Sequence, residues 1–281
     1  MIELSLTKIR SLIDPRPTDS YKGNYGHSLI IGGNEEMGGA ALLAASACVH
    51  VGSGLTSLLT SENNIGSCHA YLPEIMVGDW LNNDLSTIWL NKADQVLIGP
   101  GMGRSKESIQ LLKTIISKIH SDQVLILDGD AITLWAQEGP FACAGQLIFT
   151  PHLGEWSKLK EVTGIEDPQV FSDHYQAILV SKSHQTKIYQ PSGLSYSNIS
   201  GNPGMAIGGM GDCLAGMITG LMGQCSSHLG AVLIACYMHT AIANRIYQNN
   251  YIVLPSRIIQ SIPGFMKDLF QPKGNQIERR I

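Results

Sequence analysis

Short, continuously apolar segments recur along the chain, and each ends in a turn that is rich in glycine or polar residues. A strand with one face in water would alternate apolar and polar residues, so these segments are typical of strands buried on both faces. The strand candidates are residues 28–31, 55–59, 96–98, 124–127 and 147–149, with a further pair at 178–180 and 187–189 near an edge of the sheet.

Longer segments with helical periodicity separate these strands. They are the Ala-rich residues 38–51, residues 105–119 with one apolar face, and two patterns near the end of the chain at 213–223 and 229–247. Strands and helices in alternation predict an α/β fold in which helices cover both faces of a mostly parallel central sheet. The polar tail after Lys273 is expected to fray.

Polar and glycine-rich turns follow four of the predicted strands directly. Their sequences are GGN at 32–34, GPGMG at 99–103, DGD at 128–130 and TPH at 150–152. In an open parallel sheet, ligands bind outside the carboxyl ends of the strands. The sequence therefore predicts that these four turns line one binding edge.

The chain has 281 residues, which fits one large α/β domain over 1–281 with a sizeable core. Its net charge is −4, and no basic stripe is present, which argues against a nucleic-acid surface. Any phosphate ligand must then be held by local groups rather than by the overall field of the protein.

The six cysteines form no CxxC pair, so the sequence gives no support to a zinc or redox site, and we predict no metal held by protein side chains alone. The N-terminus lacks the apolar core of a signal peptide, and we find no apolar stretch long enough to span a membrane. These features favour reduced thiols, a cytoplasmic location and no membrane partner.

The segment at residues 201–212, GNPGMAIGGMGD, precedes one of the long helical patterns. Free N–H groups at a helix start favour an anion, and Gly208, Gly209 and Gly211 let the backbone approach phosphate oxygens closely. Asp212 would repel that phosphate, so a role as general base toward a substrate hydroxyl suits it. The alternative is a simple N-cap, which is a frequent use of Asp. Neither a Walker P-loop nor a Rossmann GxGxxG is present.

This glycine-rich segment resembles the signature of the ADP/ATP-dependent NAD(P)H-hydrate dehydratases, a family with the ribokinase-like fold. Further blocks resemble that family in the same order: KGNYGHSLIIGGNEEMGGAALLAASACVHVGSGL, LPEIM, VLIGPGMG, VLILDGDAITL and FTPHLGEWSKL. The resemblance extends from about residue 22 to residue 223. The GxGD core alone is shared with sugar and vitamin kinases, whereas the complete segment is specific to the dehydratases.

The resemblance implies a repair reaction on nicotinamide nucleotides. ADP or ATP would drive removal of water from the S-form of NAD(P)H hydrate, and Mg²⁺ would accompany the nucleotide. Asp212 would deprotonate the ring hydroxyl, which attacks the terminal phosphoryl group, and the resulting phosphate ester would leave to give NADH or NADPH. Two alternatives stay open at this point: a kinase for a sugar or vitamin-like alcohol on the same fold, and a catalytically silent nucleotide-binding protein.

The resemblance also implies a substrate pocket built from several of the predicted turns. Its members would be Ala41, Gly101, Gly103, His152 and Asp212. Each of the first four has a structural alternative, because small residues suit helix-on-sheet packing, glycines mark tight turns and a lone histidine is commonly structural. Ala41 is assigned with an uncertainty of one residue in register. Asn34 is a further candidate.

The nucleotide would lie against the glycines of the 201–212 segment and against a second segment after the strand at 178–180. In the family, a Lys-Gly pair followed by a Thr contacts the nucleotide there. This chain keeps Lys182 and Thr186 but has Ser183 in place of the glycine. The predicted nucleotide contacts are Lys182, Ser183, His184, Gln185, Thr186, Gly208, Gly209 and Gly211.

Two other motifs depart from the family or admit a simpler interpretation. Leu153 replaces the second proline of the family's TPHPGE, although His152 and Glu155 remain. Glu155 could simply start the next helix, where a negative charge is favourable. Asp128 and Asp130 could share a metal or a proton, but we favour Asp130 as the N-cap of the helix that follows.

Partners are predicted by analogy with the family. The family tends to form tetramers, so we expect a homotetramer. About 20 residues precede the first matching block, so we expect no fused domain for the epimerase that interconverts the two forms of the hydrate. A separate epimerase is then the expected pathway partner.

Overall fold

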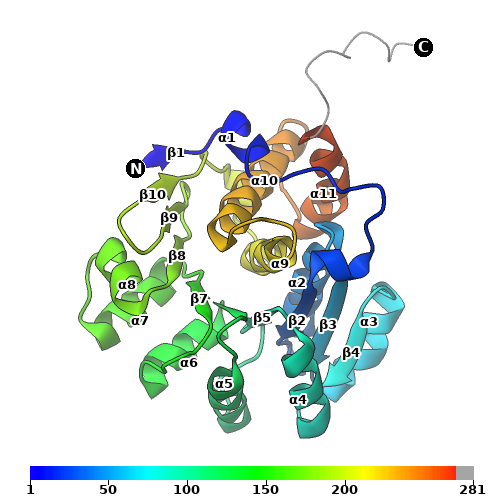
Figure 1. Cartoon of the computed structure of the whole chain (residues 1–281), viewed down its shortest axis with the longest axis vertical. Coiled ribbons are helices and arrows are strands. Elements are labelled where there is room, and N and C mark those ends of the chain that lie inside the picture. Colours follow the sequence, from blue (N-terminus) through cyan, green and yellow to red (C-terminus); the bar gives the residue numbers. More distant parts are fainter. Residues whose placement is uncertain (270–281) are drawn as a thin grey trace.

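The computed structural model of the chain describes residues 1–269, so the polar tail after Lys273 lies outside the described residues. Within that range, ten strands form one sheet (Figure 1). The strands are β1 (Ile2–Glu3), β2 (His27–Ile31), β3 (Leu55–Thr60), β4 (Met76–Asp79), β5 (Gln95–Ile98), β6 (Val124–Leu127), β7 (Gln146–Phe149), β8 (Ile178–Ser181), β9 (Lys187–Tyr189) and β10 (Ser195–Ser197).

The helices cover both faces of this sheet, as predicted (Figure 1). They are α1 (Leu6–Arg10), α2 (Gly38–His50), α3 (Ile65–Tyr71), α4 (Asn83–Lys92), α5 (Lys106–Lys118), α6 (Asp130–Glu138), α7 (Leu153–Thr163), α8 (Pro168–Tyr175), α9 (Met210–Met222), α10 (His228–Tyr247) and α11 (Pro255–Leu269). The predicted α/β architecture with a mostly parallel sheet is confirmed.

The strand order is β1-β10-β9-β8-β7-β6-β5-β2-β3-β4, and the seven strands from β8 to β4 are all parallel to one another. Among the strands of residues 1–269, only β9 runs antiparallel, and it pairs with β8 on one side and β10 on the other. The predicted strand pair at 178–180 and 187–189 is therefore present, and it lies third and fourth from one edge of the sheet. The short strands β10 and β1, which the sequence pattern did not reveal, extend the sheet beyond β9.

Continuously apolar strands create two separate cores because successive side chains point to opposite faces. In β2, Ile30 belongs to the core under α2, α9, α10 and α11, whereas Leu29 and Ile31 belong to the core under the helices of the other face. All five residues of β2 are buried. This double burial explains why the strands lack polar alternation.

Helix α10 is long and apolar enough to cross a membrane by length and composition. The sequence prediction concerned an unbroken apolar stretch, and α10 is interrupted by Thr240, Asn244 and Arg245. However, 67% of the qualifying window is buried within the protein, where α10 packs against α9 and α11. Its apolar surface is accounted for by the core of the α9 face.

Candidate functional site

The turns after the parallel strands meet at one edge of the sheet, as the sequence predicts. The turn after β2 is joined to the turn after β5, because the N–H of Gly33 donates to the carbonyl of Pro100 at 2.8 Å and that of Asn34 to Gly101 at 2.7 Å. Farther along the same edge, His152 after β7 pairs with Lys182 after β8 in an isolated parallel bridge. Backbone contacts therefore join neighbouring turns along this edge.

Helix α9 begins at this edge without a side-chain cap. Its N-cap is Gly209, which has φ 90° in the left-handed region that favours glycine. A Cβ at Gly209 would also lie 2.7 Å from Leu43 Cδ1. The first N–H groups of any α-helix lack intrahelical partners, so those of Met210 and Gly211 are available to an anion. The predicted anion-binding geometry at Gly208, Gly209 and Gly211 is thus compatible with the structure.

Asp212 is the third residue of α9 rather than its N-cap. Burial, together with the negative charge of Asp128, raises the pKa of Asp212 to about 6, and Lys182 offsets part of this rise. A carboxylate with this pKa is ionised at neutral pH and can still accept a proton readily. This combination suits a general base beside a bound phosphate.

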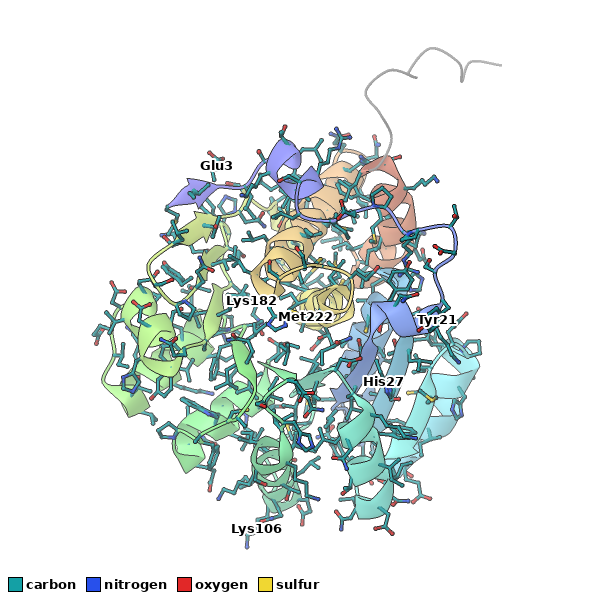
Figure 2. The ribbon with its side chains drawn as sticks, in the orientation of Figure 1. Glu3, Tyr21, His27, Lys106, Lys182 and Met222 are labelled. Atoms are coloured by element: carbon teal, nitrogen blue, oxygen red, sulfur yellow. The ribbon has the colours of Figure 1, made fainter. Side chains whose placement is uncertain are left out.

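A buried ion pair lies next to the first turn of α9. Asp128 Oδ1 accepts hydrogen bonds from Lys182 Nζ at 2.6 Å and from Thr150 Oγ1 at 2.5 Å. Burial alone would lower the pKa of Lys182, but the carboxylates of Asp128 and Glu155 outweigh it and raise that pKa. Figure 2 labels Lys182 near the centre of the view. The ammonium group therefore stays charged and is directed toward Asp128, while Asp212 is left outside the pair.

A Cβ at Gly211 would lie 3.2 Å from Lys182 Nζ, so the ammonium group touches the open start of α9. Lys182 was predicted as a nucleotide contact. The structure gives it a first partner, Asp128, and places its charge beside the predicted anion site. A positive charge and unpaired N–H groups at one spot are the elements that hold a phosphate.

Helix α7 begins at the same edge with a complete cap of its own. His152 is the N-cap, and its Nδ1 accepts hydrogen bonds from the N–H groups of Gly154 at 3.0 Å and Glu155 at 3.3 Å. In return, a Glu155 carboxylate oxygen accepts from the N–H of His152 at 2.9 Å. This capping box fixes the imidazole with Nδ1 as acceptor, so Nε2 carries the proton and points to the other Glu155 oxygen at 3.2 Å.

Both members of this cap have shifted pKa values. Burial raises the pKa of Glu155 to about 6, with Lys182 opposing that rise. Burial and the nearby Lys182 lower the pKa of His152, which keeps the imidazole neutral. The helix-start role suggested for Glu155 is confirmed, and His152 proves to have a structural role in addition to any contact with substrate.

The GPGMG turn after β5 approaches α2 closely. Gly101 has φ 59°, and a Cβ there would lie 2.6 Å from the carbonyl oxygen of Met37, so only glycine fits. The N–H of Gly103 donates to Asp130 Oδ2 at 3.0 Å, and Arg104 Nε donates to Asp130 Oδ1 at 2.8 Å.

The predicted N-cap role of Asp130 is therefore wrong. The N-cap of α6 is Gly129, and Asp130 is the first residue of that helix. Its carboxylate turns away from the backbone of its own helix because the neighbouring turn offers it a backbone N–H and a guanidinium group. Asp130 thus holds the Gly103 turn in place.

Ala41 is completely buried in α2 and packs under Gly33, where a Cβ would lie 3.0 Å from its own. The preceding Ala40 is partly exposed and adjoins Gly101, since a Cβ at Gly101 would lie 2.9 Å from that of Ala40. The assignment of Ala41 to the substrate pocket stays a prediction, and Ala40 is the residue of this turn that borders the GPGMG loop.

The segment after β8 forms one wall of a cavity of about 640 Å³ that reaches the start of α9. Lys182, Ser183, His184 and Thr186 line this cavity, whereas Gln185 does not. The hydroxyl of Ser183 donates to the carbonyl of Gln185 at 2.7 Å, so the substituted serine closes its own tight turn. The cavity volume lies in the ordinary range for a small-molecule site.

Two polar residues of this cavity were missed by the sequence reasoning. They are Asn198, which follows β10, and His239 in the middle of α10. Neither belongs to a motif: Asn198 lies in a polar loop and His239 lies within a long apolar helical pattern. No local signal in the sequence distinguishes them from surface or core residues.

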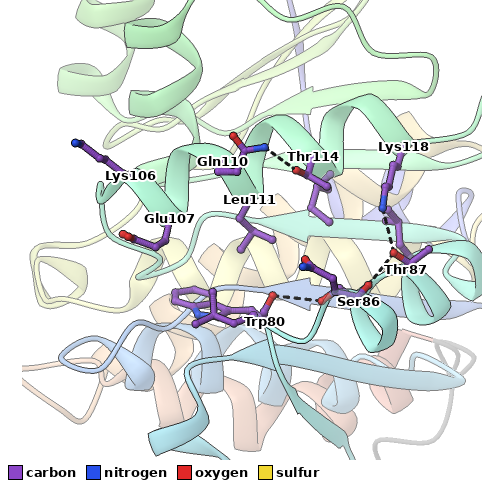
Figure 3. Close-up of a pocket in the computed structure, with 13 residues that line it drawn as sticks. Trp80, Ser86, Thr87, Lys106, Glu107, Gln110, Leu111, Thr114 and Lys118 are labelled. Carbon is purple, nitrogen blue, oxygen red and sulfur yellow. Dashed lines mark hydrogen bonds between the residues drawn. The ribbon is translucent and has the colours of Figure 1, made fainter.

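A second cavity, of about 490 Å³, lies between α4 and α5 (Figure 3). Its polar side chains are largely bonded to one another, as Lys118 Nζ donates to Thr87 Oγ1 at 3.1 Å and Ser86 Oγ donates to the carbonyl of Trp80 at 3.3 Å. Its lining includes neither Lys182 nor the first residues of α9, which line the other cavity. The cavity at the start of α9 is therefore the candidate active site.

Comparisons with known proteins show the family of the chain. A sequence model of the NAD(P)H-hydrate dehydratase family matches residues 28–264. An ADP-dependent (S)-NAD(P)H-hydrate dehydratase of Enterococcus faecalis is 39% identical over 276 residues, which are 96% of this chain and 94% of the relative.

Two solved structures have the same architecture. A ribokinase-like superfamily protein of Enterococcus faecalis is 38% identical with a TM-score of 0.91, and the match covers 96% of this chain and 97% of that one. The ADP/ATP-dependent NAD(P)H-hydrate dehydratase of Bacillus subtilis, co-crystallised with ATP and Mg²⁺, is 27% identical with a TM-score of 0.83, covering 95% and 98% of the two chains.

Proposed function

The chain belongs to the NAD(P)H-hydrate dehydratase family, and on that premise we propose how its site carries out the family's reaction. The reaction is the ADP- or ATP-dependent dehydration of the S-form of NAD(P)H hydrate, which regenerates NADH or NADPH. The observation that carries the proposal is the carboxylate of Asp212, placed beside an uncapped helix start and left outside the Asp128–Lys182 ion pair.

Asp212 takes the proton from the hydroxyl on the hydrated ring. The oxygen then attacks the terminal phosphorus of the nucleotide, and the bond from that phosphorus to the bridging oxygen breaks. The N–H groups at Gly211 and Met210, with the ammonium group of Lys182, stabilise the charge on the transferred group. Phosphate then leaves the ring carbon with the C–O electron pair, and a proton is lost from the adjacent carbon to restore the dihydronicotinamide.

The substrate would lie between Asp212 and the turns after β5 and β7. The Gly101–Gly103 turn offers bare backbone, and His152 offers a neutral imidazole with a fixed tautomer. The nucleotide would extend from the start of α9 along Lys182–Thr186. These assignments follow the family resemblance, and the position of these turns at one edge of the sheet supports them.

Mg²⁺ would enter together with the nucleotide. Within residues 1–269, no group of three His, Cys, Asp or Glu side chains is arranged to hold a metal ion. Asp128 and Glu155 are the other carboxylates whose charges act on Asp212. The ion would shield the negative charge of the phosphates.

The direct test is an assay with the purified protein, NADH hydrate and ADP. We expect NADH absorbance to return in proportion to the ADP consumed, and ATP is the matched second nucleotide. A kinase for a sugar or vitamin-like alcohol is the competing function, because the GxGD core is shared with such enzymes. Phosphorylation of such an alcohol, with no return of NADH from its hydrate, would overturn the proposal.

Four further proposals concern the domain content, location, oligomeric state and partner of the enzyme. We propose a single dehydratase domain, a cytoplasmic location, a homotetramer and a separate epimerase that supplies the S-form. Light scattering on the purified protein measures its oligomeric state. Adding an epimerase to an assay with racemic hydrate tests the partner, because complete rather than half conversion is expected.

A further inference from the structure

Two basic side chains flank the proposed substrate wall, and the dehydration mechanism uses neither of them. Arg104 directly follows the Gly101–Gly103 turn after β5, and Lys158 lies on α7, which begins after β7. Helix α6 follows β6, which is the strand between β5 and β7 in the sheet. Arg104 and Lys158 therefore come from opposite sides of α6.

Both basic side chains are bonded to residues near the start of α6. Arg104 Nε donates to Asp130 Oδ1 at 2.8 Å, and Lys158 Nζ donates to Thr133 Oγ1 at 3.1 Å. Asp130 and Thr133 are three positions apart in one helix, so their side chains are neighbours on its surface. The guanidinium and ammonium groups thus converge beside the first turn of α6, at the carboxyl edge of the sheet.

These two bonds leave most of the N–H donors of both basic groups unused. The terminal nitrogens of Arg104 make no hydrogen bond to residues 1–269, and its side chain is 52% exposed. Lys158 is partly buried and forms no ion pair among the described residues, where its ammonium group donates to a neutral hydroxyl. Asp130 offsets only one of the two positive charges. A planar guanidinium fork beside an ammonium group suits phosphate oxygens.

The position of the two basic groups relative to the start of α9 fits a dinucleotide substrate. A Cβ at Gly211 would lie 4.0 Å from Asp128 Oδ2, so Asp128 borders the start of α9. Asp130 follows two residues later, which is at most about 7 Å of chain. Burial raises the pKa of Glu155 to about 6, and the nearby charge of Lys158 is among those that oppose the rise. In a nicotinamide dinucleotide, the pyrophosphate lies one ribose away from the ring.

We propose that Arg104 and Lys158 bind the pyrophosphate of NAD(P)H hydrate and thereby position the hydrated ring against Asp212. The terminal guanidinium nitrogens and the ammonium group donate hydrogen bonds to the phosphate oxygens. Asp130 and Thr133 are positioning residues in this arrangement, because they act by holding the two basic groups. This inference deepens the proposed function and rests on it for the identity of the substrate.

The test measures KM for NADH hydrate in Arg104→Gln and Lys158→Gln, which remove the charge and keep a polar side chain. We expect each variant to raise this KM at least about fivefold, because a charge-assisted hydrogen bond is lost, and to leave KM for ADP unchanged. The matched control is Lys160→Gln, which removes the same charge from α7 where it faces Glu166 and should change neither KM. An unchanged KM for NADH hydrate in either test variant would overturn the inference.

A substrate without phosphate separates substrate binding from a structural role. The hydrate of reduced nicotinamide riboside has the same ring and ribose, so Arg104→Gln and Lys158→Gln should leave its kcat/KM unchanged while lowering that of NADH hydrate. Thr133→Val removes the hydroxyl that holds Lys158 but keeps the charge, so it should raise KM for NADH hydrate by less than about threefold. Equal losses with both substrates, or a loss in Thr133→Val as large as in Lys158→Gln, would overturn the inference.

NADPH hydrate distinguishes the pyrophosphate from the additional phosphate that this substrate carries on its adenosine ribose. Because both hydrates share the pyrophosphate, we expect each variant to raise KM for NADH hydrate and for NADPH hydrate by the same factor. An effect confined to NADPH hydrate would place the basic groups at the additional phosphate and overturn their assignment to the pyrophosphate.

Calorimetric titration of NADH hydrate in the absence of ADP separates this inference from the proposed function. Weaker binding in both Arg104→Gln and Lys158→Gln would support the inference even if the wild type regenerated no NADH. Conversely, ADP-driven return of NADH with unchanged binding of the hydrate in these variants would leave the proposed function intact and overturn the role of the two basic residues.

Discussion

Helices α7 and α9 begin at the same edge of the sheet, but the N–H groups of their first turns differ in their hydrogen bonding. Side chains accept hydrogen bonds from these groups in α7 but not in α9, as far as residues 1–269 show. At α7, His152 and Glu155 satisfy those groups within the protein. At α9, the N-cap is a bare glycine, and no side chain caps the helix. A closed helix start provides rigidity, whereas an open one provides a site for an anion.

The capped and uncapped helix starts also give different roles to two carboxylates at equivalent positions. Glu155 and Asp212 are each the third residue of their helix, and both have a pKa of about 6. Glu155 uses its oxygens on the cap residue His152, at 2.9 and 3.2 Å. Asp212 has no such task, because its helix starts at Gly209. Position in the first turn of a helix is therefore not sufficient for a carboxylate to act as a general base. Its oxygens must also not be occupied by hydrogen bonds that hold the helix start.

The largest expected effect comes from removing the carboxylate at the open helix start. Asp212→Asn should lower kcat by about 10²- to 10⁴-fold, the usual contribution of a general base. Single-turnover measurements with NADH hydrate and ADP would show it. An unchanged rate would refute the assignment of Asp212. The matched Glu155→Gln should lose far less activity but should destabilise α7.

Asp212→Asn should also stabilise the protein at neutral pH. The raised pKa means that the folded state resists ionisation of Asp212, which costs stability once the pH exceeds the ordinary value of 3.8. The variant's advantage should therefore be absent below pH 3.8, grow between 3.8 and about 6, and then stay constant. Its size is on the order of 1–3 kcal/mol in the free energy of unfolding, measurable by denaturant titration at several pH values.

Closing the open helix start with a methyl group is the next largest change. Gly211→Ala places a Cβ 3.2 Å from Lys182 Nζ, in the space that a phosphate would use. We expect KM for ADP to rise about tenfold or more, while thermal stability is kept because Ala favours helix interiors. The control at the closed start is Leu153→Ala, an exposed position in α7 that should affect neither property. A loss of stability in Gly211→Ala without a change in KM would contradict the phosphate site.

The pH dependence of kcat/KM is expected to follow the ionisation of Asp212. Since Asp212 works as a base only when ionised, and its pKa is about 6, activity should be constant above that pH and fall about tenfold for each unit below it. Glu155 titrates in the same range, so the Glu155→Gln variant tells the two carboxylates apart. If the falling limb survives in Glu155→Gln, it belongs to Asp212.

A smaller effect is expected at the closed helix start. His152→Ala removes the cap of α7 and should cost about 1 kcal/mol in the free energy of unfolding, whereas His152→Asn keeps a capping side chain and should cost little. If the imidazole also touches the substrate, both variants should raise KM for NAD(P)H hydrate. A normal KM in His152→Asn would restrict His152 to its structural role.

The smallest effect is expected at Ser183, in the segment after β8 that lines the candidate active-site cavity. Ser183 stands where the family has glycine, and its hydroxyl is used within its own turn. Ser183→Gly should therefore change the affinity for ADP by about twofold or less, or ~0.5 kcal/mol. Titration of ADP into wild type and variant would measure it. A gain above about tenfold would mean that the serine holds the backbone away from the nucleotide.

Much of this architecture could be predicted because it depends on local patterns. Continuous apolar strands such as 28–31 and the periodic helix at 105–119 indicated a parallel sheet with two cores. The carboxyl ends of parallel strands meet by geometry, so the convergence of GPGMG and TPH followed directly. The short strand β10 escaped prediction because its sequence, Ser195-Tyr196-Ser197, has one aromatic residue between two serines and no apolar run.

What the sequence by itself determined is the fold class, the binding edge and the glycine-rich start of α9, since these depend on residues close together in the chain. Only the tertiary structure decided which polar groups become partners. Lys182 reaches Asp128 across 54 positions, Asp130 leaves its own helix for the Gly103 turn, and Asn198 binds α10. These pairings result from burial, because a buried polar group without a hydrogen bond costs free energy. Each group therefore bonds to the partner that the packing of the chain places nearby.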